Sequence, residues 1–582
     1  MSKQSYPIQV QGKREQLVTA LGAYPALARM SLGNTESAEQ HRAYRLRVKL
    51  VAHQGRLGLY AKESHEVVDI PDCRVMTPRV AAAVACVRRA LPFAFPLLAL
   101  DAREVDEGVL VTLIVAPNVP RAQVEAAARA LMQTEPTILG VSLARRAPTS
   151  AQVLGSAPEP LLGVFVAPHR FADDAPFHLA TPGGFVQAHG GQTEKLHGRI
   201  EAELSRALGG LARKSVLELY AGAGALALRL ARAGAIVTAS DSYAPSLRVL
   251  CDAAKQQNLS LSVLEADARS ALEKVRSADA IIVDPPRKGL APEVRIGIAA
   301  AKPRRLVYVS CEPRTLARDL AHFAELGLFP ESMQPWDMIP HSDAVETLAI
   351  LAPTSAPLPR IVYEDERLIA VDKPAYVPTT PQGEHTHSLL SAVRRLPNAA
   401  AAVPVHRLDL GTSGVCLFAR EPEAVKSLAG ALADGQKQYL ALVRGVTHKR
   451  GRIDRAFNDG TGLREAVTRY ERREIVGTHS LICAMPETGR RHQIRRHLAS
   501  IEHPLLGDAR YGHPPTNRHF EERHGLDRPF LHLARVELAG ERPLTLLSEL
   551  AVELRAVLQS LQQVRRSSTG SVEAQQAASR GE

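Results

Sequence analysis

The sequence predicts a multidomain protein that combines an α/β domain on a doubly wound parallel sheet with an α+β domain on a mainly antiparallel sheet. With 582 residues, the chain is long enough for roughly three or four domains. Apolar strands alternate with helices over residues 190–352, which is typical of a parallel sheet covered on both faces. Over residues 359–560, short strands joined by tight turns favour antiparallel pairing. A Pro-, Ser- and Ala-rich segment at 351–360 separates the two blocks.

The N-terminal part is expected to be a mixed α/β module without visible chemistry. Residues 42–70 alternate apolar and polar side chains like paired strands. Helices are expected at 77–92 and 120–133, on either side of an apolar strand at 108–117. The expected division of the chain is 1–180, 181–352, a linker at 353–358, 359–562 and a disordered polar tail at 563–582.

Within the α/β block, a helix at 193–208 leads into strand 215–220 and then into a Gly-rich turn that opens a helix. The alternation continues in the same way to the end of the block. The further expected elements are strand 235–241, helix 245–257, strand 261–267, helix 268–277, strand 280–286 and strand 305–311.

The composition suggests a polyanionic partner without establishing one. The chain has 72 Lys and Arg against 61 Asp and Glu, a net charge of +11, and 58 of the basic residues are arginine. Arginine pairs bidentately with phosphate and stacks on bases, which suggests a nucleic acid. A GC-rich genome that encodes Arg in place of Lys explains the ratio equally well. Aromatic residues make up only 4% of the chain, so a surface rich in stacking rings is not expected.

Several protein classes are disfavoured. No apolar stretch approaches the ~20 residues of a membrane span. The N-terminus lacks the apolar core of a signal peptide, so we expect a cytoplasmic protein without membrane association. The six cysteines include no C-x-x-C pair, which disfavours zinc, iron–sulfur and disulfide sites. His385 and His387 lack an evident third ligand, so a plain loop is expected there and no metal site is predicted.

A first set of candidate functional residues lies where parallel strands are expected to end. LELYAGAGA places Gly222 and Gly224 between a strand and a helix, where backbone N–H groups can bind a ligand; a purely structural tight turn is an equal alternative. Asp241 ends the next strand, where a carboxylate can bind ribose hydroxyls. IIVDPPRKGL puts Asp284 at the end of a central strand, and VYVSCEPRTLARD puts Cys311 at the end of the following one.

Together with Glu346 in PWDMIPHSDAVETLAIL, these motifs resemble the RNA 5-methyluridine methyltransferase family over residues 5–352. The resemblance implies a Rossmann-like class I methyltransferase domain that uses S-adenosylmethionine, preceded by an RNA-recognition region. It implies Cys311 as the nucleophile that adds to carbon 6 of uracil and Glu346 as the base that removes the carbon-5 proton, with Arg287 holding the substrate. The residues implied at the cofactor site are Gln187, Tyr220, Gly222, Gly224, Asp241 and Asp284.

Alternatives remain open for these residues, and the sequence departs from the family in places. Cys311 read alone is a buried structural thiol, and Glu346 a solvated carboxylate. The family's usual Ser-Cys-Asn-Pro is Ser-Cys-Glu-Pro here, and Glu312 beside the thiol is expected to raise its pKa and weaken activity. Asp267 fits a helix cap as well as an adenine contact. Because no cysteine occurs in the first 72 residues, the iron–sulfur cluster of many relatives is expected to be absent.

A second set of motifs lies in the last block. VHRLDLGTSGVCLFAR occurs with IAVDKPAYVPTTP, QKQYLALVRG, ETGRRHQIRRHLASIEHPLLGDARYG and RPFLHLARVEL. These five motifs resemble the RluA-type pseudouridine synthases over residues 359–545, in the same order. Pseudouridine formation moves the ribose bond of uracil from nitrogen 1 to carbon 5 with no redox change, so no cofactor is expected.

The resemblance implies a role for each of four residues. Asp409 is the expected nucleophile or base at the sugar, and Arg495 keeps its carboxylate charged. Tyr439 is expected to stack on the base, and Arg407 to fill the gap left by a flipped nucleotide. Read singly, Asp409 is a turn cap, Arg495 part of a solvated phosphate-binding face and Tyr439 core. Tyr376 replaces the glycine usual after Lys-Pro-Ala.

The sequence therefore predicts a bifunctional RNA-modifying enzyme that methylates carbon 5 of one uridine and isomerises a different uridine to pseudouridine. Ribosomal RNA is preferred over tRNA as the partner, and no oligomeric state is predicted. The alternative is a pseudouridine synthase whose methyltransferase half is weak or inactive and serves as an RNA-binding module.

Overall fold

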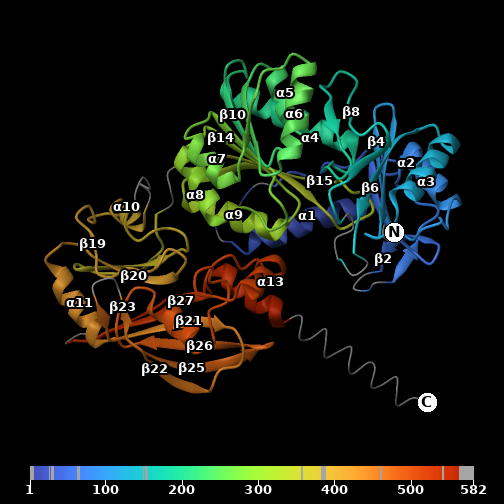
Figure 1. Ribbon diagram of the computed structural model, residues 1–582. Coiled ribbons are helices and arrows are strands. Elements are labelled where there is room, and N and C mark those ends of the chain that lie inside the picture. The colour runs from blue at the N-terminus through green and yellow to red at the C-terminus, as the bar shows by residue number, and fades with distance from the viewer. Residues whose placement is uncertain are drawn as a thin grey trace, which may run out of the picture.

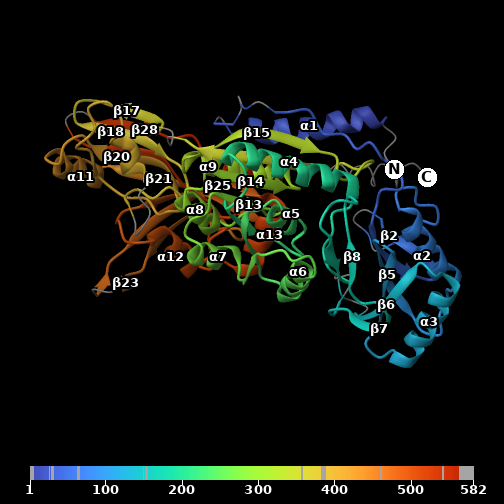
Figure 2. The same ribbon diagram turned by 90° about the horizontal axis from the view of Figure 1, so that it is seen from above.

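Three large sheets organise the chain in the computed structural model (Figure 1). We call residues 47–163 the first domain, α1 (Tyr6–Gly22) with residues 167–353 the central domain, and residues 359–562 the C-terminal domain. Figure 2 shows the central domain between the other two. The structure describes residues 5–562 except 25, 28–29, 31, 62–63, 65, 148–149, 151–154, 355–357, 382–387, 459–461 and 541–542. The expected tail at 563–582, part of the expected linker, and His385 and His387 lie outside the described residues.

The first domain is a seven-stranded sheet with helices packed on one of its sides. Its strand order is β3-β2-β1-β4-β5-β6-β7, and β5 and β6 pair in parallel. Every residue of β5 is buried, which accounts for its uninterrupted apolar sequence. The two helices expected from the sequence are present. The elements are β1 (Arg47–His53), β2 (Arg56–Tyr60), β3 (Val67–Asp69), α2 (Pro78–Arg89), β4 (Leu97–Val105), β5 (Gly108–Val115), α3 (Arg121–Thr134), β6 (Ile138–Arg145) and β7 (Glu159–Gly163).

The central domain is a seven-stranded sheet in the order β12-β11-β10-β13-β14-β16-β15. Five strands are parallel, as expected, whereas β15 and β16 form an antiparallel hairpin that extends the sheet beyond β14. Its elements are β8 (Ala167–His169), β9 (His178–Ala180), α4 (Gly190–Leu208), β10 (Ser215–Leu219), α5 (Ala225–Arg232), β11 (Ile236–Asp241), α6 (Ala244–Gln256), β12 (Ser262–Glu265), α7 (Ala268–Lys274), β13 (Ala280–Val283), α8 (Pro292–Ala301), β14 (Arg305–Ser310), α9 (Pro313–Glu325), β15 (Leu328–Trp336) and β16 (Glu346–Pro353).

The N-terminal helix α1 belongs to the core of the central domain. It contacts α9 and β15, although 290 or more residues separate it from them in sequence. Leu17 and Leu21 are buried in the same apolar cluster as Leu217 and Leu219 of β10. Lys13 reinforces this packing, because its buried ammonium group donates to Asp337 at 2.6 Å. Helix α1 therefore packs against the same sheet as the strands of this domain. Because β10, β11, β13 and β14 are parallel, their carboxyl ends share one edge of that sheet.

The C-terminal domain is built on a ten-stranded sheet whose main path is β17-β18-β20-β27-β21-β26-β25-β22. The pairing is antiparallel except between β20 and β27, as expected for an α+β domain. Its elements are β17 (Ile361–Glu364), β18 (Leu368–Lys373), α10 (Leu389–Val393), β19 (Val403–Pro404), β20 (Ser413–Ala419), α11 (Ala424–Asp434), β21 (Gln436–Val443), β22 (Arg450–Asp454), β23 (Phe457–Asn458), β24 (Leu463–Arg464), β25 (Val467–Val476), β26 (His479–Pro486), α12 (Gln493–Ser500), α13 (Pro514–His524), β27 (Leu531–Leu538) and β28 (Leu544–Leu547). Among the described helices of the whole chain, none has both the length and the apolar character that crossing a bilayer requires.

Candidate active sites

A cavity of about 130 Å³ opens at the carboxyl end of β10 in the central domain. Five of the six residues that the sequence assigned to a cofactor site line it, namely Gln187, Tyr220, Gly222, Gly224 and Asp284. The sixth, Asp241, adjoins the cavity through Gly222, whose backbone N–H donates to the Asp241 carboxylate at 2.9 Å. The structure therefore brings the predicted cofactor residues together.

The turn after β10 needs glycine for two separate reasons. Gly222 and Gly224 have φ angles of 55° and 73°, in the left-handed region that favours glycine. A Cβ atom on Gly224 would lie 2.3 Å from the side chain of Leu250, whereas nothing lies within 4 Å of the corresponding position on Gly222. Gly224 therefore lets α5 start close to α6, and Gly222 leaves open space beside the cavity.

The cavity is acidic, and one of its acidic groups was not identified from the sequence. Glu218 of β10 lines the cavity, and its Oε2 atom is buried without a hydrogen-bond partner. Burial, and next the charge of Asp284, raises the pKa of Glu218 to about 8. Asp284 lines the cavity, and its side chain is exposed there. Desolvation by the protein around it raises its pKa to about 7. A carboxylate within an apolar strand is the signal that could have identified Glu218.

Cys311 lies directly after β14, within electrostatic range of Glu346 and Asp284. Burial first, and then the charges of Glu346 and Asp284, raise the pKa of the Cys311 thiol to about 11, and Arg287 opposes them. Glu346 begins β16 and is buried, with its Oε1 atom unpartnered; burial and Asp284 raise its pKa well above the usual range. Burial therefore disfavours the ionised form of both the thiol and the Glu346 carboxyl group.

Two other acidic residues act as helix caps. The Glu312 side chain accepts a hydrogen bond from the backbone N–H of Arg314 at the start of α9. The carboxylates that raise the pKa of the Cys311 thiol are those of Glu346 and Asp284. The expectation that Glu312 perturbs Cys311 is thus not supported. Asp267 accepts from the N–H of Ser270 at 2.7 Å and caps α7, which favours the capping alternative.

The second candidate site lies at the start of α12 in the C-terminal domain. Asp409 is partly exposed, and its carboxylate lies 3.6 Å from Nη1 of Arg495. Arg495 is held from behind by Asp508, which accepts from Nε and Nη2 at 2.7 and 2.8 Å and is fully buried. Asp508 also accepts from the backbone N–H groups of Arg510 and Tyr511. This bidentate pair fixes the guanidinium group beside Asp409.

His492 and Tyr511 complete the surroundings of Asp409. Nε2 of His492 lies 3.8 Å from the Asp409 carboxylate, and its Nδ1 atom is 3.2 Å from the Tyr511 hydroxyl. Arg495 also stacks on the Tyr511 ring at 5.2 Å. The sequence did not single out His492, Tyr511 or Asp508, although all three occur in the quoted ETGRRHQIRR…GDARYG motif.

The remaining predicted residues flank the same carboxylate. Tyr439 of β21 packs in two apolar clusters, and its pKa is raised by burial and next by the charge of Asp409, so the hydroxyl stays protonated. Arg407 is exposed to solvent two residues before Asp409. Across the described part of the chain, no group of three or more His, Cys, Asp or Glu side chains is arranged to hold a metal ion.

Two families of known proteins match this chain. The family model for tRNA (uracil-5-)-methyltransferases matches residues 200–351, and that for RNA pseudouridylate synthases matches residues 367–500. Ribosomal large subunit pseudouridine synthase D of Xanthomonas campestris is 34% identical, over 36% of this chain and 71% of that protein. tRNA pseudouridine synthase C of Haemophilus ducreyi is 32% identical, over 30% of this chain and 82% of that protein. An uncharacterized RNA methyltransferase of Gloeobacter violaceus is 30% identical, over 60% of this chain and 78% of that protein.

The matches fall on the two parts of the chain that carry the candidate sites. The methyltransferase match contains the β10 turn, Cys311 and Glu346, and the synthase match contains Asp409, Tyr439 and Arg495. The chain therefore belongs to two families, the RNA methyltransferases and the RNA pseudouridine synthases, which are fused in one polypeptide.

Proposed function

We propose that the protein methylates carbon 5 of one uridine in its central domain and converts a different uridine to pseudouridine in its C-terminal domain. The observation that carries this proposal is the presence of two separate constellations, a thiol beside buried carboxyl groups and a carboxylate beside an anchored arginine. Cys311 and its neighbouring carboxyl groups lie within the methyltransferase match, and Asp409 and Arg495 lie within the synthase match.

The cavity beside β10 fits S-adenosylmethionine. A methyl donor of this kind carries a positive sulfonium, and the cavity offers Glu218 with an unpartnered carboxyl oxygen together with Asp284. Asp241 stands at the end of β11, where it can accept from ribose hydroxyls, and Gly222 leaves room for the ligand beside it. When bound, the cofactor supplies an electrophilic methyl group.

The central domain's own residues perform the remaining chemistry. The Cys311 thiolate adds to carbon 6 of the uracil, and this makes carbon 5 nucleophilic enough to accept the methyl group. Glu346 then removes the carbon-5 proton, and the electrons of that bond expel the cysteine. Since Asp284 and Glu346 both raise the thiol pKa, a cation bound near Asp284 lowers it and favours the thiolate.

The C-terminal domain needs only its side chains. Asp409 acts at the ribose or at the base while the glycosidic bond shifts from nitrogen 1 to carbon 5, and Arg495 is the cation that pairs with its carboxylate. Tyr439, protonated and packed against two apolar clusters within electrostatic range of Asp409, supports the flipped base. The proton released from carbon 5 returns to the nitrogen that has left the sugar, so that atoms and charges balance.

The two reactions exclude each other on one nucleotide. Pseudouridine uses carbon 5 for its glycosidic bond, and 5-methyluridine has that carbon blocked. We therefore propose two different uridines. The names of the relatives include both tRNA and large-subunit ribosomal RNA enzymes. We propose ribosomal RNA, because a long RNA offers separate uridines to both sites.

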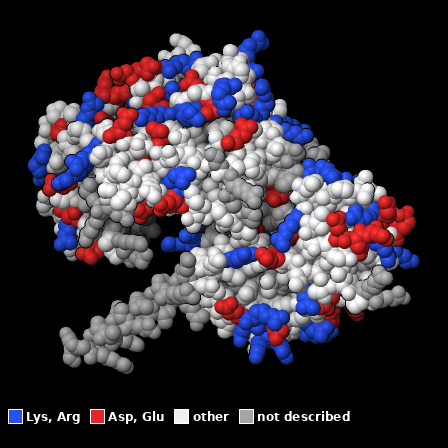
Figure 3. All heavy atoms as spheres, turned by 180° about the vertical axis from the view of Figure 1, so that it is seen from behind, with Lys and Arg blue, Asp and Glu red and all other residues white. Residues whose placement is uncertain are grey.

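The charge distribution is compatible with an extended RNA. In the view of Figure 3, basic side chains are scattered over both lobes and interspersed with acidic ones, with a basic cluster along the lower edge of the C-terminal domain. Arg450, Arg452, Arg469 and Arg473 of β22 and β25 are exposed in this domain. These exposed arginines are therefore expected to contribute to RNA contact.

One observation favours a second candidate function. A thiol with a pKa of about 11 is a poor nucleophile at neutral pH, and this would suit a central domain that binds RNA for the synthase without methylating it. The two candidates differ in whether any methyl transfer occurs.

A single assay tests both proposals. RNA tritiated at carbon 5 of uracil releases tritium in either reaction, so an increment that depends on S-adenosylmethionine reports methylation and the remainder reports isomerisation. We expect Cys311→Ala to abolish only the increment and Asp409→Ala only the remainder. An unchanged increment in Cys311→Ala would overturn the proposed methylation mechanism, and the absence of any increment in the native protein would favour the binding module.

A further inference from the structure

A buried ion cluster joins the central and C-terminal domains. Nη2 of Arg295, on α8, donates to the Asp527 carboxylate of the C-terminal domain at 2.6 Å, and Nη1 of Arg318, on α9, lies 3.5 Å from it. Arg295 is 1% exposed and Asp527 8%. Because both charges are out of water, this contact is specific and costly to break. The domains therefore meet through a defined polar interface.

The cluster is tied to the loops around Cys311. Asp319 of α9 accepts from Arg295 at 2.7 Å, from the Tyr308 hydroxyl at 2.7 Å and from the backbone N–H of Leu290 at 2.8 Å. Arg318 donates to the carbonyl of Lys288 at 2.9 Å. Helix α9 begins two residues after Cys311. The helix that follows the proposed methylation nucleophile therefore carries part of the domain interface.

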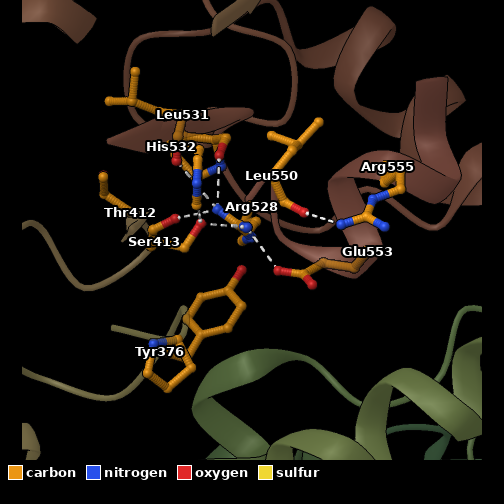
Figure 4. A network of polar contacts seen from close by, with 12 residues as sticks. Tyr376, Thr412, Ser413, Arg528, Leu531, His532, Leu550, Glu553 and Arg555 are labelled. Carbon is orange, nitrogen blue, oxygen red and sulfur yellow. Dashed lines mark hydrogen bonds and ion pairs between the residues drawn. The ribbon is translucent and has the colours of Figure 1, made fainter. Parts of the chain in front are cut away.

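Tyr376 reaches from the C-terminal domain into this cluster. Its hydroxyl donates to the backbone carbonyl of Asp527 at 2.6 Å, and its ring lies 5.4 Å from the Arg295 guanidinium and 5.3 Å from the His322 ring. Figure 4 shows the ring beside a helix of the central domain, with its hydroxyl pointing toward Arg528. Its φ angle of 62° lies in the left-handed region that favours glycine. The contacts of the side chain compensate for that backbone strain.

The other end of Tyr376 holds the loop that carries Asp409. Its backbone N–H donates to the carbonyl of Leu410 at 2.6 Å. Arg528 donates to the carbonyl of Gly411 at 2.9 Å, and Lys373 to that of Thr412 at 2.9 Å. Three consecutive carbonyls after Asp409 are thus held by three donors.

Arg528 is in turn fixed by further contacts. It donates to the Ser413 hydroxyl at 2.9 Å and to Glu553 at 2.6 Å, as Figure 4 shows. It also follows Asp527 directly in the sequence, so the residue paired with the central domain is adjacent to a residue that binds the loop. A continuous set of short contacts therefore runs from Arg295 through Tyr376 and Asp527 to the backbone beside Asp409.

We propose that Tyr376 is a positioning residue through which helices α8 and α9 of the central domain hold the Asp409 loop in its productive geometry. The proposal rests on the proposed function, because it takes Asp409 as the reacting carboxylate. It gives the fusion a physical consequence: the synthase reaction depends on the central domain even when no methyl group is transferred.

The test compares Tyr376→Phe and Tyr376→Gly in the full-length protein. Phenylalanine keeps the ring contacts and removes the hydrogen bond to Asp527, whereas glycine removes both and is suited to the positive φ. We expect kcat for pseudouridine formation to fall about threefold in the first variant and at least about tenfold in the second, since small displacements of a reacting group are costly. KM for RNA should stay within about twofold, because no RNA contact is removed.

Controls separate positioning from folding. Tyr363 lies on β17, and its hydroxyl donates to the exposed Asp365 side chain at 3.0 Å. Tyr363→Phe removes this hydroxyl and should leave kcat unchanged. A purely structural role of Tyr376 would lower the melting temperature without changing kcat below the transition. Unchanged kcat in Tyr376→Gly, or in Tyr376→Phe if the glycine variant does not fold, overturns the proposal. Asp409→Ala in the same assay keeps the two failures apart: if it retains activity, the proposed synthase mechanism is wrong, whatever Tyr376 does.

Discussion

Replacing Asp508 with asparagine tests the anchoring of Arg495, on which the proposed synthase chemistry depends. Asp508 is fully buried and accepts two charge-assisted hydrogen bonds from Arg495, at 2.7 and 2.8 Å. Asparagine has nearly the same shape, but it replaces one accepting oxygen with an amide that cannot accept a hydrogen bond from the guanidinium. One charge-assisted bond is therefore lost, and Arg495 loses the nearer of its two counter-charges.

The expected magnitudes follow from these contacts. A hydrogen bond to a charged group contributes ~1.5–3 kcal/mol, and breaking a buried ion pair costs ~3–5 kcal/mol, so we expect Asp508→Asn to lower the free energy of unfolding by about 3 kcal/mol. Arg495 then loses its fixed position 3.6 Å from Asp409. A displacement of about 1 Å in a reacting group can cost ~100-fold in rate, so kcat for pseudouridine formation should fall by about two orders of magnitude.

The assay combines urea unfolding with tritium release from carbon 5 in the absence of S-adenosylmethionine. Asp454→Asn is the matched control, because it removes an Arg–Asp pair of 2.6 Å in which both side chains are more than half exposed. Exposed pairs contribute ~0–1 kcal/mol, so the control should be nearly neutral in both measurements. If Asp508→Asn kept kcat within twofold of the native protein, or if both variants lost the same stability, the anchoring role of Asp508 would be refuted.

Three further predictions concern the central domain. Because the pKa of Cys311 is raised to about 11, only ~10⁻⁴ of the thiol is ionised at pH 7, and the single-turnover rate of methyl transfer should rise with pH between 7 and 9; a flat profile would contradict a rate limited by the thiolate. Glu218 has a pKa raised from 4.5 to about 8 in the folded state, so its stabilising contribution is present below pH 4.5 and lost as the pH rises through 8. Glu218→Gln should therefore be more stable than the native protein by up to ~5 kcal/mol at pH 9 and equal to it at pH 4, as measured by thermal unfolding. Glu312→Asn should change the methyl transfer rate less than about threefold, since Glu312 caps α9; a tenfold gain would restore Glu312 as a perturbing group.

The sequence predicted the elements of the site because its strong local patterns agree with the tertiary structure. The strand–turn–helix at Gly222 and Gly224 folds as expected, since both glycines adopt the left-handed conformation that the turn requires. Gln187 was assigned to the cofactor site by family resemblance only, yet it lines the same cavity as Asp284, which follows a different strand. Parallel strands explain why Asp284 lies beside the β10 turn, because the carboxyl ends of β10 and β13 share one edge of the sheet, whereas Gln187 comes from the segment before α4.

What the sequence could not show depends on contacts between distant segments. Asp508 lies 13 residues after Arg495, and a helix and a loop separate them. No periodic pattern in the sequence indicates their contact. The burial of Glu218 and the helix-capping geometry of Glu312 are set by neighbours from other elements. The interface between Arg295 and Asp527 joins residues 232 positions apart in two different domains, so it follows from their packing and from neither motif alone.

Nucleoside mass spectrometry of one RNA substrate, with the modified positions mapped, tests most directly whether one chain carries two independent sites. After incubation with S-adenosylmethionine, the native protein should produce 5-methyluridine and pseudouridine at different positions. Cys311→Ala should lose only the first product and Asp409→Ala only the second. Loss of both products in either variant, or both modifications assigned to the same nucleotide, would contradict the account.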